Sequence, residues 1–179
     1  AIATTQRANM GAMDAVKNSL QRGQSVVDVA LAAGDTVTAA LEEMKQLAVN
    51  IQSSVAGSDA ETAYLADFNA LGGEIDKALK GASFDGVNLW NTTTATNLTT
   101  SVSGGTYQVG FGTVDKAAAA PIVAVSAGTA ARAGATTAIV DAAIKEVTSD
   151  LATLGTQSKS VGRQLTFVGK LQDATEAGI

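Results

Sequence analysis

Apolar residues recur along the first third of the chain at alternating steps of three and four. Eleven of the thirteen positions in this series are apolar, and the other two are glycine. Such a 3.5-residue repeat is the seam of a helix that packs lengthwise against other helices. A rod-like helix is therefore predicted over residues 13–55, and its glycines predict sites where another backbone comes close. The series is Met13, Val16, Leu20, Gly23, Val27, Ala30, Gly34, Val37, Leu41, Met44, Ala48, Ile51 and Val55.

A second helix is predicted to start near Asp59 and to stop at Gly81. Ser58 and Glu61 have the S-x-x-E spacing of a capping box, in which side chains bind the free backbone N–H groups of a helix start. Gly72-Gly73 interrupts this helix, which indicates either a kink or a close contact. The apolar face of the helix holds Leu65, Phe68, Leu71, Ile75 and Leu79.

The last quarter of the chain repeats the pattern of the first helix. Eight of its ten seam positions are apolar, so a third long helix is predicted to pack along the first. Both seams are still running where the sequence begins and ends, and we expect each helix to be cut from a longer one. The ten positions are Val140, Ile144, Val147, Leu151, Leu154, Ser158, Val161, Leu165, Val168 and Gln172.

The stretch between the second and third helices has a different composition. It is rich in Thr and Gly, and its segment TYQVGF alternates in the manner of a strand, which predicts a small hairpin or two. Pro121 makes a mid-helix position unfavourable there. The predicted fold is mainly α: an elongated antiparallel three-helix, coiled-coil-like bundle with a small β-hairpin region. One elongated domain would join an N-terminal helical part (1–90), a short β/loop region (91–135) and a C-terminal helix (136–179).

Composition limits the chemistry that this chain can perform. It contains no cysteine and no histidine, which removes thiol chemistry, the commonest general base and the commonest transition-metal ligand. We therefore expect no enzymatic activity, no metal site and no cofactor. The net charge of −5 disfavours a nucleic-acid partner, and no apolar run is long enough for insertion into a membrane.

Three segments carry a family resemblance. They are MKQLAVNIQSS at 44–54, DFNALGGEIDKALKGASFDGVNLW at 67–90 and AAIKEVTSDLATLGTQSKSVGRQL at 142–165. In this order they resemble the D1 core region of bacterial flagellin, over about residues 10–90 and 136–179. The resemblance implies an extracellular structural subunit of the flagellar filament that acts in motility by self-assembly with other flagellin subunits. The long terminal segments of the family, which pair inside the filament, have no counterpart here.

The resemblance gives a meaning to the segment FDGVNLW at 84–90. Asp85-Gly86 is a dipeptide typical of tight turns. In flagellins the matching turn leads from the second helix into the hairpin region and is held on the helical bundle. The resemblance implies that Phe84, Leu89 and Trp90 are the apolar anchors of this turn. An ordinary hairpin turn with a small apolar cluster has the same geometry.

Two other functions remain open at this point. The family resemblance also allows the hook–filament junction protein, which shares flagellin-like terminal helices. A cell-surface adhesin could reuse the same fold to bind glycans, and Trp90 and Tyr107 would then be its sugar-stacking side chains.

The resemblance also bears on host recognition. A Toll-like receptor senses many flagellins through a motif similar to L-Q-R-V-R-E-L-A-V, and the matching stretch here is LEEMKQLAV at 41–49. Leu47 keeps the apolar contact position, whereas Glu43 stands at the central arginine position. A glutamate presents acceptors and a negative charge where an arginine presents a fork of donors. Weak or absent receptor recognition is therefore expected, with Glu43 and Leu47 as the receptor-facing positions.

Overall fold

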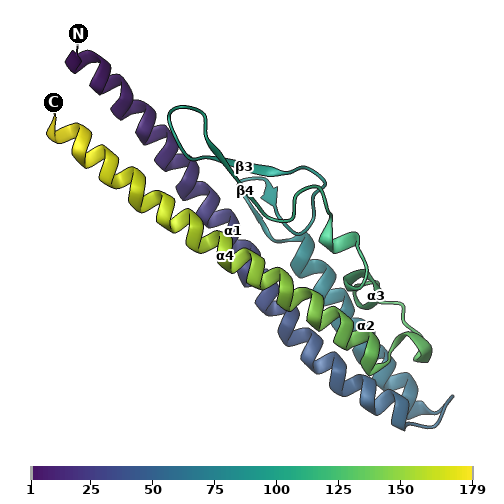
Figure 1. Ribbon diagram of the computed structural model, residues 1–179. Coiled ribbons are helices and arrows are strands. Elements are labelled where there is room, and N and C mark those ends of the chain that lie inside the picture. The colour runs from purple at the N-terminus through teal and green to yellow at the C-terminus, as the bar shows by residue number, and fades with distance from the viewer. Residues whose placement is uncertain (1, 179) are drawn as a thin grey trace.

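The protein is an elongated helical rod, described here by a computed structural model over residues 2–178. Figure 1 shows the long helices lying side by side, with both termini at one end of the rod. The prediction of a mainly α fold is confirmed. The elements are α1 (Ile2–Ser53), α2 (Asp59–Lys80), β1 (Ser83–Phe84), β2 (Val87–Asn88), β3 (Thr96–Thr99), β4 (Thr106–Val109), η1 (Lys116–Ala118), α3 (Ile122–Ser126), η2 (Arg132–Gly134) and α4 (Thr137–Ala177).

Helix α1 is the axis of the rod. Its 52 residues correspond to a length of about 78 Å at 1.5 Å per residue. Every predicted seam position from Met13 to Ile51 is buried. Val55 is the exception, because α1 ends at Ser53 and the chain then turns outward, which leaves Val55 77% exposed. The prediction that the seam reaches Val55 is therefore wrong.

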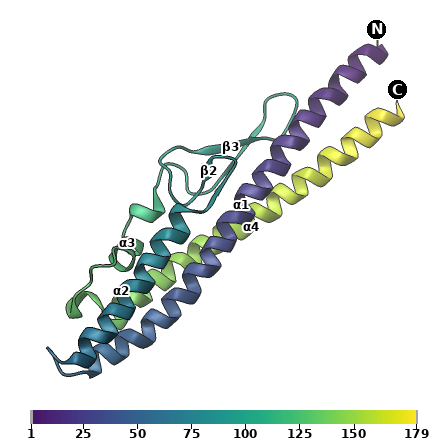
Figure 2. The same ribbon diagram turned by 180° about the vertical axis from the view of Figure 1, so that it is seen from behind.

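Helix α4 runs antiparallel to α1 along most of its length (Figures 1 and 2). Its seam positions are buried or half-buried, and the two polar seam positions each bind a polar residue of α1. The Gln172 amide donates to Asp14 Oδ1 at 2.5 Å, and the Gln24 amide donates to Ser158 Oγ at 2.6 Å. Because each of these part-buried polar pairs forms in one register only, the two contacts fix how α1 and α4 are aligned.

Helix α2 begins and ends where the sequence predicts. The Ser58 side chain accepts a hydrogen bond from Glu61 N, and Gly81 caps the C-terminal end. The Glu61 carboxylate accepts from Gly57 N at 3.3 Å, one residue before the position that a standard capping box uses. The helix continues without interruption through Gly72-Gly73, so a close contact rather than a kink explains the first of these glycines.

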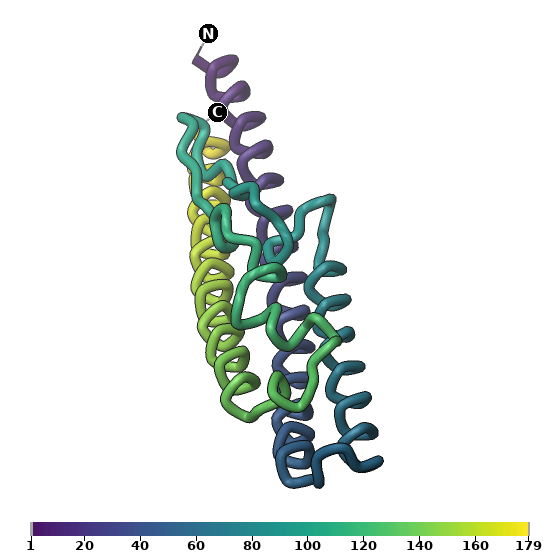
Figure 3. Tube along the Cα trace, turned by 90° about the vertical axis from the view of Figure 1, so that its right-hand side faces the viewer, coloured from purple at the N-terminus to yellow at the C-terminus, as the bar shows by residue number. Residues whose placement is uncertain are grey.

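The segment between α2 and α4 covers one side of the bundle. It forms two antiparallel hairpins, β1–β2 and β3–β4, followed by short helical turns. Figure 3 shows this segment lying over the helices between α4 and α2, and α3 contacts both. Pro121 is the N-cap residue of α3, which confirms that it is not inside a helix.

Three buried glycines leave room for neighbouring parts of the chain. A Cβ on Gly23 would overlap Leu98, and a Cβ on Gly34 would overlap Leu151. Side chains therefore fill the two α1 sites, where we expected a neighbouring backbone. A backbone does approach Gly72, where a Cβ would overlap the Val125 carbonyl oxygen. This contact seats α3 directly on α2.

The adjacent glycines of α2 provide a matched test of this close contact. We expect Gly72→Ala to destabilise the protein by roughly 1–3 kcal/mol, because α3 has to move away from the added methyl group. Gly73 has no atom within 4 Å of a built Cβ, so Gly73→Ala should stabilise α2 by up to about 1 kcal/mol through helix propensity alone. Urea unfolding of both variants measures the difference, and equal effects would contradict the proposed fit.

Candidate functional site

Residues 83–88 form a hairpin with a two-residue turn, which lies against α1. Phe84 pairs with Val87, and the φ angles of Asp85 (53°) and Gly86 (78°) are both positive, as a type I′ turn requires. Asp85 lies 3.6 Å from the Arg22 side chain, and both groups are more than half exposed, so this ion pair contributes little. The turn itself is thus formed by Asp85-Gly86.

The anchors of this turn differ from those implied by the family resemblance. Leu89 and Trp90 are buried, with 2% and 0% of their surface exposed, but Phe84 is 39% exposed. The interpretation of Phe84 as an anchor is therefore wrong. Both residues of its two-residue strand are exposed, so Phe84 lies outside the core that Leu89 and Trp90 enter.

Asn88 is an anchor that the sequence analysis missed. Its side-chain amide donates to the carbonyl oxygens of Leu79 (2.7 Å) and Lys80 (3.2 Å), which are left free at the end of α2. Its side-chain oxygen accepts from the backbone N–H groups of Trp90 (2.9 Å) and Asn91 (3.1 Å). One buried side chain therefore caps α2 and orients the residue that enters the core.

Trp90 fastens the hairpin region to α1. Its indole N–H donates to the Ala30 carbonyl oxygen at 2.8 Å, within the body of the helix. The ring also packs against Phe111, with the ring centroids 5.0 Å apart. A Cβ on Gly34 would lie 3.1 Å from the Trp90 ring, so the missing side chain at Gly34 makes room for the indole.

A charged cluster lies beside this aromatic pair. Lys116 Nζ is 2.6 Å from Glu146, 3.2 Å from Asp150 and 5.3 Å from the centre of the Phe111 ring. Burial raises the pKa of the Asp150 carboxyl, although Lys116 partly opposes this. The folded protein therefore binds a proton at Asp150 more tightly than the unfolded chain does. Lys116 is the cation that stabilises the buried Asp150 carboxylate.

Amide side chains attach the rest of the connecting segment to the helices. Gln157 of α4 accepts from Gly110 N at 2.7 Å and donates to Gly110 O at 3.0 Å. Asn69 of α2 forms the same two-bond pair with Ala130, at 2.8 and 2.9 Å. These bonds satisfy loop backbone groups that have no strand partner.

The two positions that the family resemblance implies to face a receptor, Glu43 and Leu47, border a groove between α1 and α2. Glu43 is exposed, and Leu47 is half-buried. Both line a depression of about 510 Å³, together with Leu71 and the carboxylates Asp67 and Glu74 of α2. An acidic rim above an apolar floor suits a basic partner with an apolar side chain.

The structure removes one of the two sugar-stacking candidates. Trp90 is fully buried and has no ring face available to a glycan, so the assignment of Trp90 as a stacking residue is wrong. Tyr107 is half-buried on β4 and is the remaining candidate. Within residues 2–178, no cluster of acidic side chains is arranged to hold a metal ion, and no helix has the length and apolar character needed to cross a bilayer.

Comparisons with known proteins agree with one another. The model of the bacterial flagellin N-terminal helical region matches residues 1–95. Curated relatives from Caulobacter vibrioides align with the whole chain: flagellin FljM is 40% identical over 180 residues, and flagellins FljK and FljO are each 39% identical over 180 residues. The chain spans 66% of the length of each of these relatives.

The two aromatic residues of the 84–90 segment should respond differently to truncation. Trp90→Ala removes a buried ring and the hydrogen bond to Ala30, and we expect it to cost about 3–5 kcal/mol of the free energy of unfolding. Phe84→Ala, the matched control in the same segment, should change that free energy by less than about 1 kcal/mol. Thermal unfolding followed by circular dichroism measures both variants. A larger loss for Phe84→Ala would show that Phe84 is the anchor after all.

Proposed function

The chain belongs to the bacterial flagellin family, and we propose that it forms the core of a structural subunit of the bacterial flagellar filament. The alignment of the entire chain with flagellins at about 40% identity is the observation that carries this proposal. We further propose an extracellular location, a role in motility through self-assembly, and other flagellin subunits as partners.

The construction of the rod supports a mechanical role. Apolar seams fasten α1, α2 and α4 to one another, and two polar side-chain contacts, Gln172–Asp14 and Gln24–Ser158, join α1 to α4, while most charged side chains face outward. A subunit of this kind acts by holding its shape and presenting its surface to neighbours, and it needs no catalytic group or cofactor. Enzymatic activity is not part of the proposal.

Neither alternative function gains support from a specific observation. The adhesin hypothesis depends on exposed aromatic rings, and the burial of Trp90 removes one of its two stacking residues. The hypothesis of a hook–filament junction protein rests only on helices like those of flagellin. The relatives that align with the whole chain are named flagellins. The filament subunit is therefore the function proposed.

The filament role can be tested in the organism that carries the gene. Filaments sheared from cells should yield peptides of this sequence by mass spectrometry, and gold-labelled antibodies against the hairpin region should decorate them along their whole length. A deletion strain is the control for antibody specificity. Labelling confined to the base of the filament would favour the junction protein, and absence of the sequence from filaments would contradict both roles.

We also propose weak or absent recognition by the Toll-like receptor. The exposed Glu43 carboxylate would meet receptor groups suited to an arginine, and a mismatched charge in a desolvated interface costs several kcal/mol. In a reporter-cell assay the protein should signal weakly, and Glu43→Arg should restore part of the signal. Glu42→Arg, which makes the same charge change at the adjacent exposed residue, is the matched control. Strong signalling by the unmodified protein would contradict the transfer of this motif.

A further inference from the structure

Charge is unevenly distributed along the rod. The end that carries both termini, residues 1–25 with 155–179, contains six Lys or Arg and three Asp or Glu. The remainder, residues 26–154, contains six Lys or Arg and fourteen Asp or Glu. The rod therefore has a basic end and an acidic end, and two copies would attract each other head to tail.

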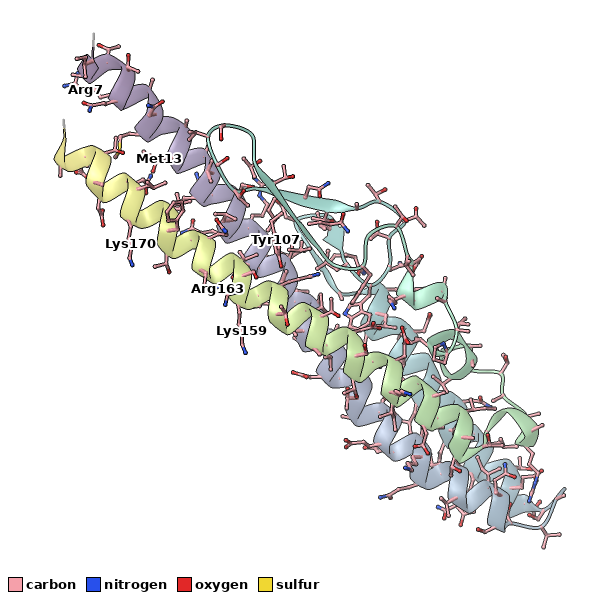
Figure 4. All side chains as sticks on the ribbon, in the orientation of Figure 1. Arg7, Met13, Tyr107, Lys159, Arg163 and Lys170 are labelled. Atoms are coloured by element: carbon pink, nitrogen blue, oxygen red, sulfur yellow. The ribbon has the colours of Figure 1, made fainter. Side chains whose placement is uncertain are left out.

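The basic end presents one continuous face of α4, here called the basic stripe: Lys159, Arg163, Phe167 and Lys170. Steps of four, four and three place these residues on one side of the helix. In Figure 4, Lys159, Arg163 and Lys170 point away from the bundle. Phe167 is 56% exposed. Within residues 2–178, none of the three cations forms an ion pair, and Arg163 donates only to Ser160 of its own helix.

The groove between α1 and α2 has the complementary pattern. Asp67, Leu71 and Glu74 follow α2 at steps of four and three, the same steps that separate Arg163, Phe167 and Lys170 on α4. All three line the groove, and Glu43 adds a carboxylate from α1. In the part of the chain that the structure describes, no ion pair neutralises Asp67, Glu74 or Glu43. We call this the acid-rimmed groove.

We propose that the basic stripe of one copy docks in the acid-rimmed groove of a second copy of this chain. Phe167 lies against Leu71, with Arg163 facing Asp67 and Lys170 facing Glu74. Helices α2 and α4 run in the same direction along the rod (Figure 1), so two rods in the same orientation, displaced along their common axis, bring these helices together in parallel. The contact joins different faces of the two copies, which makes an open head-to-tail chain rather than a closed dimer.

The two kinds of side chain have separate roles in this contact. Burial of the exposed Phe167 ring against the apolar floor of the groove supplies the attraction that does not depend on salt. Exposed ion pairs contribute little each, but Arg163 facing Asp67 and Lys170 facing Glu74 select the partner and the register. This inference rests on the proposed filament role, because it names the surfaces through which neighbouring subunits would meet.

Sedimentation equilibrium of the 179-residue chain at 50 and 500 mM NaCl tests the contact. We expect concentration-dependent association at low salt, weakened at least about tenfold at high salt by screening. We expect at least about a tenfold loss of association in each of two double variants, Arg163→Glu/Lys170→Glu and Asp67→Lys/Glu74→Lys. A 1:1 mixture of the two variants should restore association, because the reversed stripe of one variant then meets the reversed groove of the other. The control of equal net charge is Lys77→Glu/Lys145→Glu, which reverses two exposed cations outside the basic stripe and the groove lining. This control should associate about tenfold more strongly than the variant with the reversed basic stripe.

Each possible result decides the proposal. No association at low salt, no recovery in the mixture, or an equal loss in the control would overturn it. The filament role is tested separately, by the peptides recovered from sheared filaments. If filaments contain the sequence but the reversed variants associate normally, only the contact is wrong. If the reversal experiment succeeds but filaments lack the sequence, the contact stands and the filament role fails.

Discussion

The antiparallel seam between α1 and α4 is the constraint on which the rest of the structure depends. Most of the stability of a helix in a protein comes from packing of its apolar face, and α1 and α4 bury their apolar stripes along each other. The polar pairs Asp14–Gln172 and Gln24–Ser158 then select one alignment out of several that the heptad repeat would allow. Once that register is set, Gly34 on α1 faces Leu151 on α4, and the position where the hairpin region can enter is determined.

The hairpin region is held by insertion rather than by a sheet. Its strands are two to four residues long and pair only with each other, so they provide little stability alone. Stability comes from Trp90, which enters beside Gly34 and donates to Ala30, and from Asn88, which ties that entry point to the end of α2. The space that the Trp90 ring occupies on α1 therefore depends on the absence of a side chain at Gly34.

Sequence patterns predicted what depends on local periodicity and failed where distant groups decide. The 3.5-residue repeat predicted α1 and α4, and Ser58 predicted the start of α2, because burial and capping leave marks within a few residues. The exposure of Phe84 depends on which way a two-residue strand faces, and a strand this short leaves no periodic pattern in the sequence. Asn88 gave no signal either, since its partners at the end of α2 are defined only once the chain has folded back.

The interior and the outer surface of the rod use different forces, and this separates folding from assembly. The links that close the fold are mainly apolar contacts and neutral amide or indole hydrogen bonds, as at Trp90, Gln157 and Asn69, and salt screens such contacts weakly. Charged residues without an ion pair, such as Arg163 and Glu74, lie on the outside, where ionic strength acts on them directly. Ion pairs inside the subunit, such as Lys45–Asp141 and Lys116–Glu146, are few beside these contacts. In a subunit built in this way, ionic strength acts more on the affinity for neighbours than on the fold.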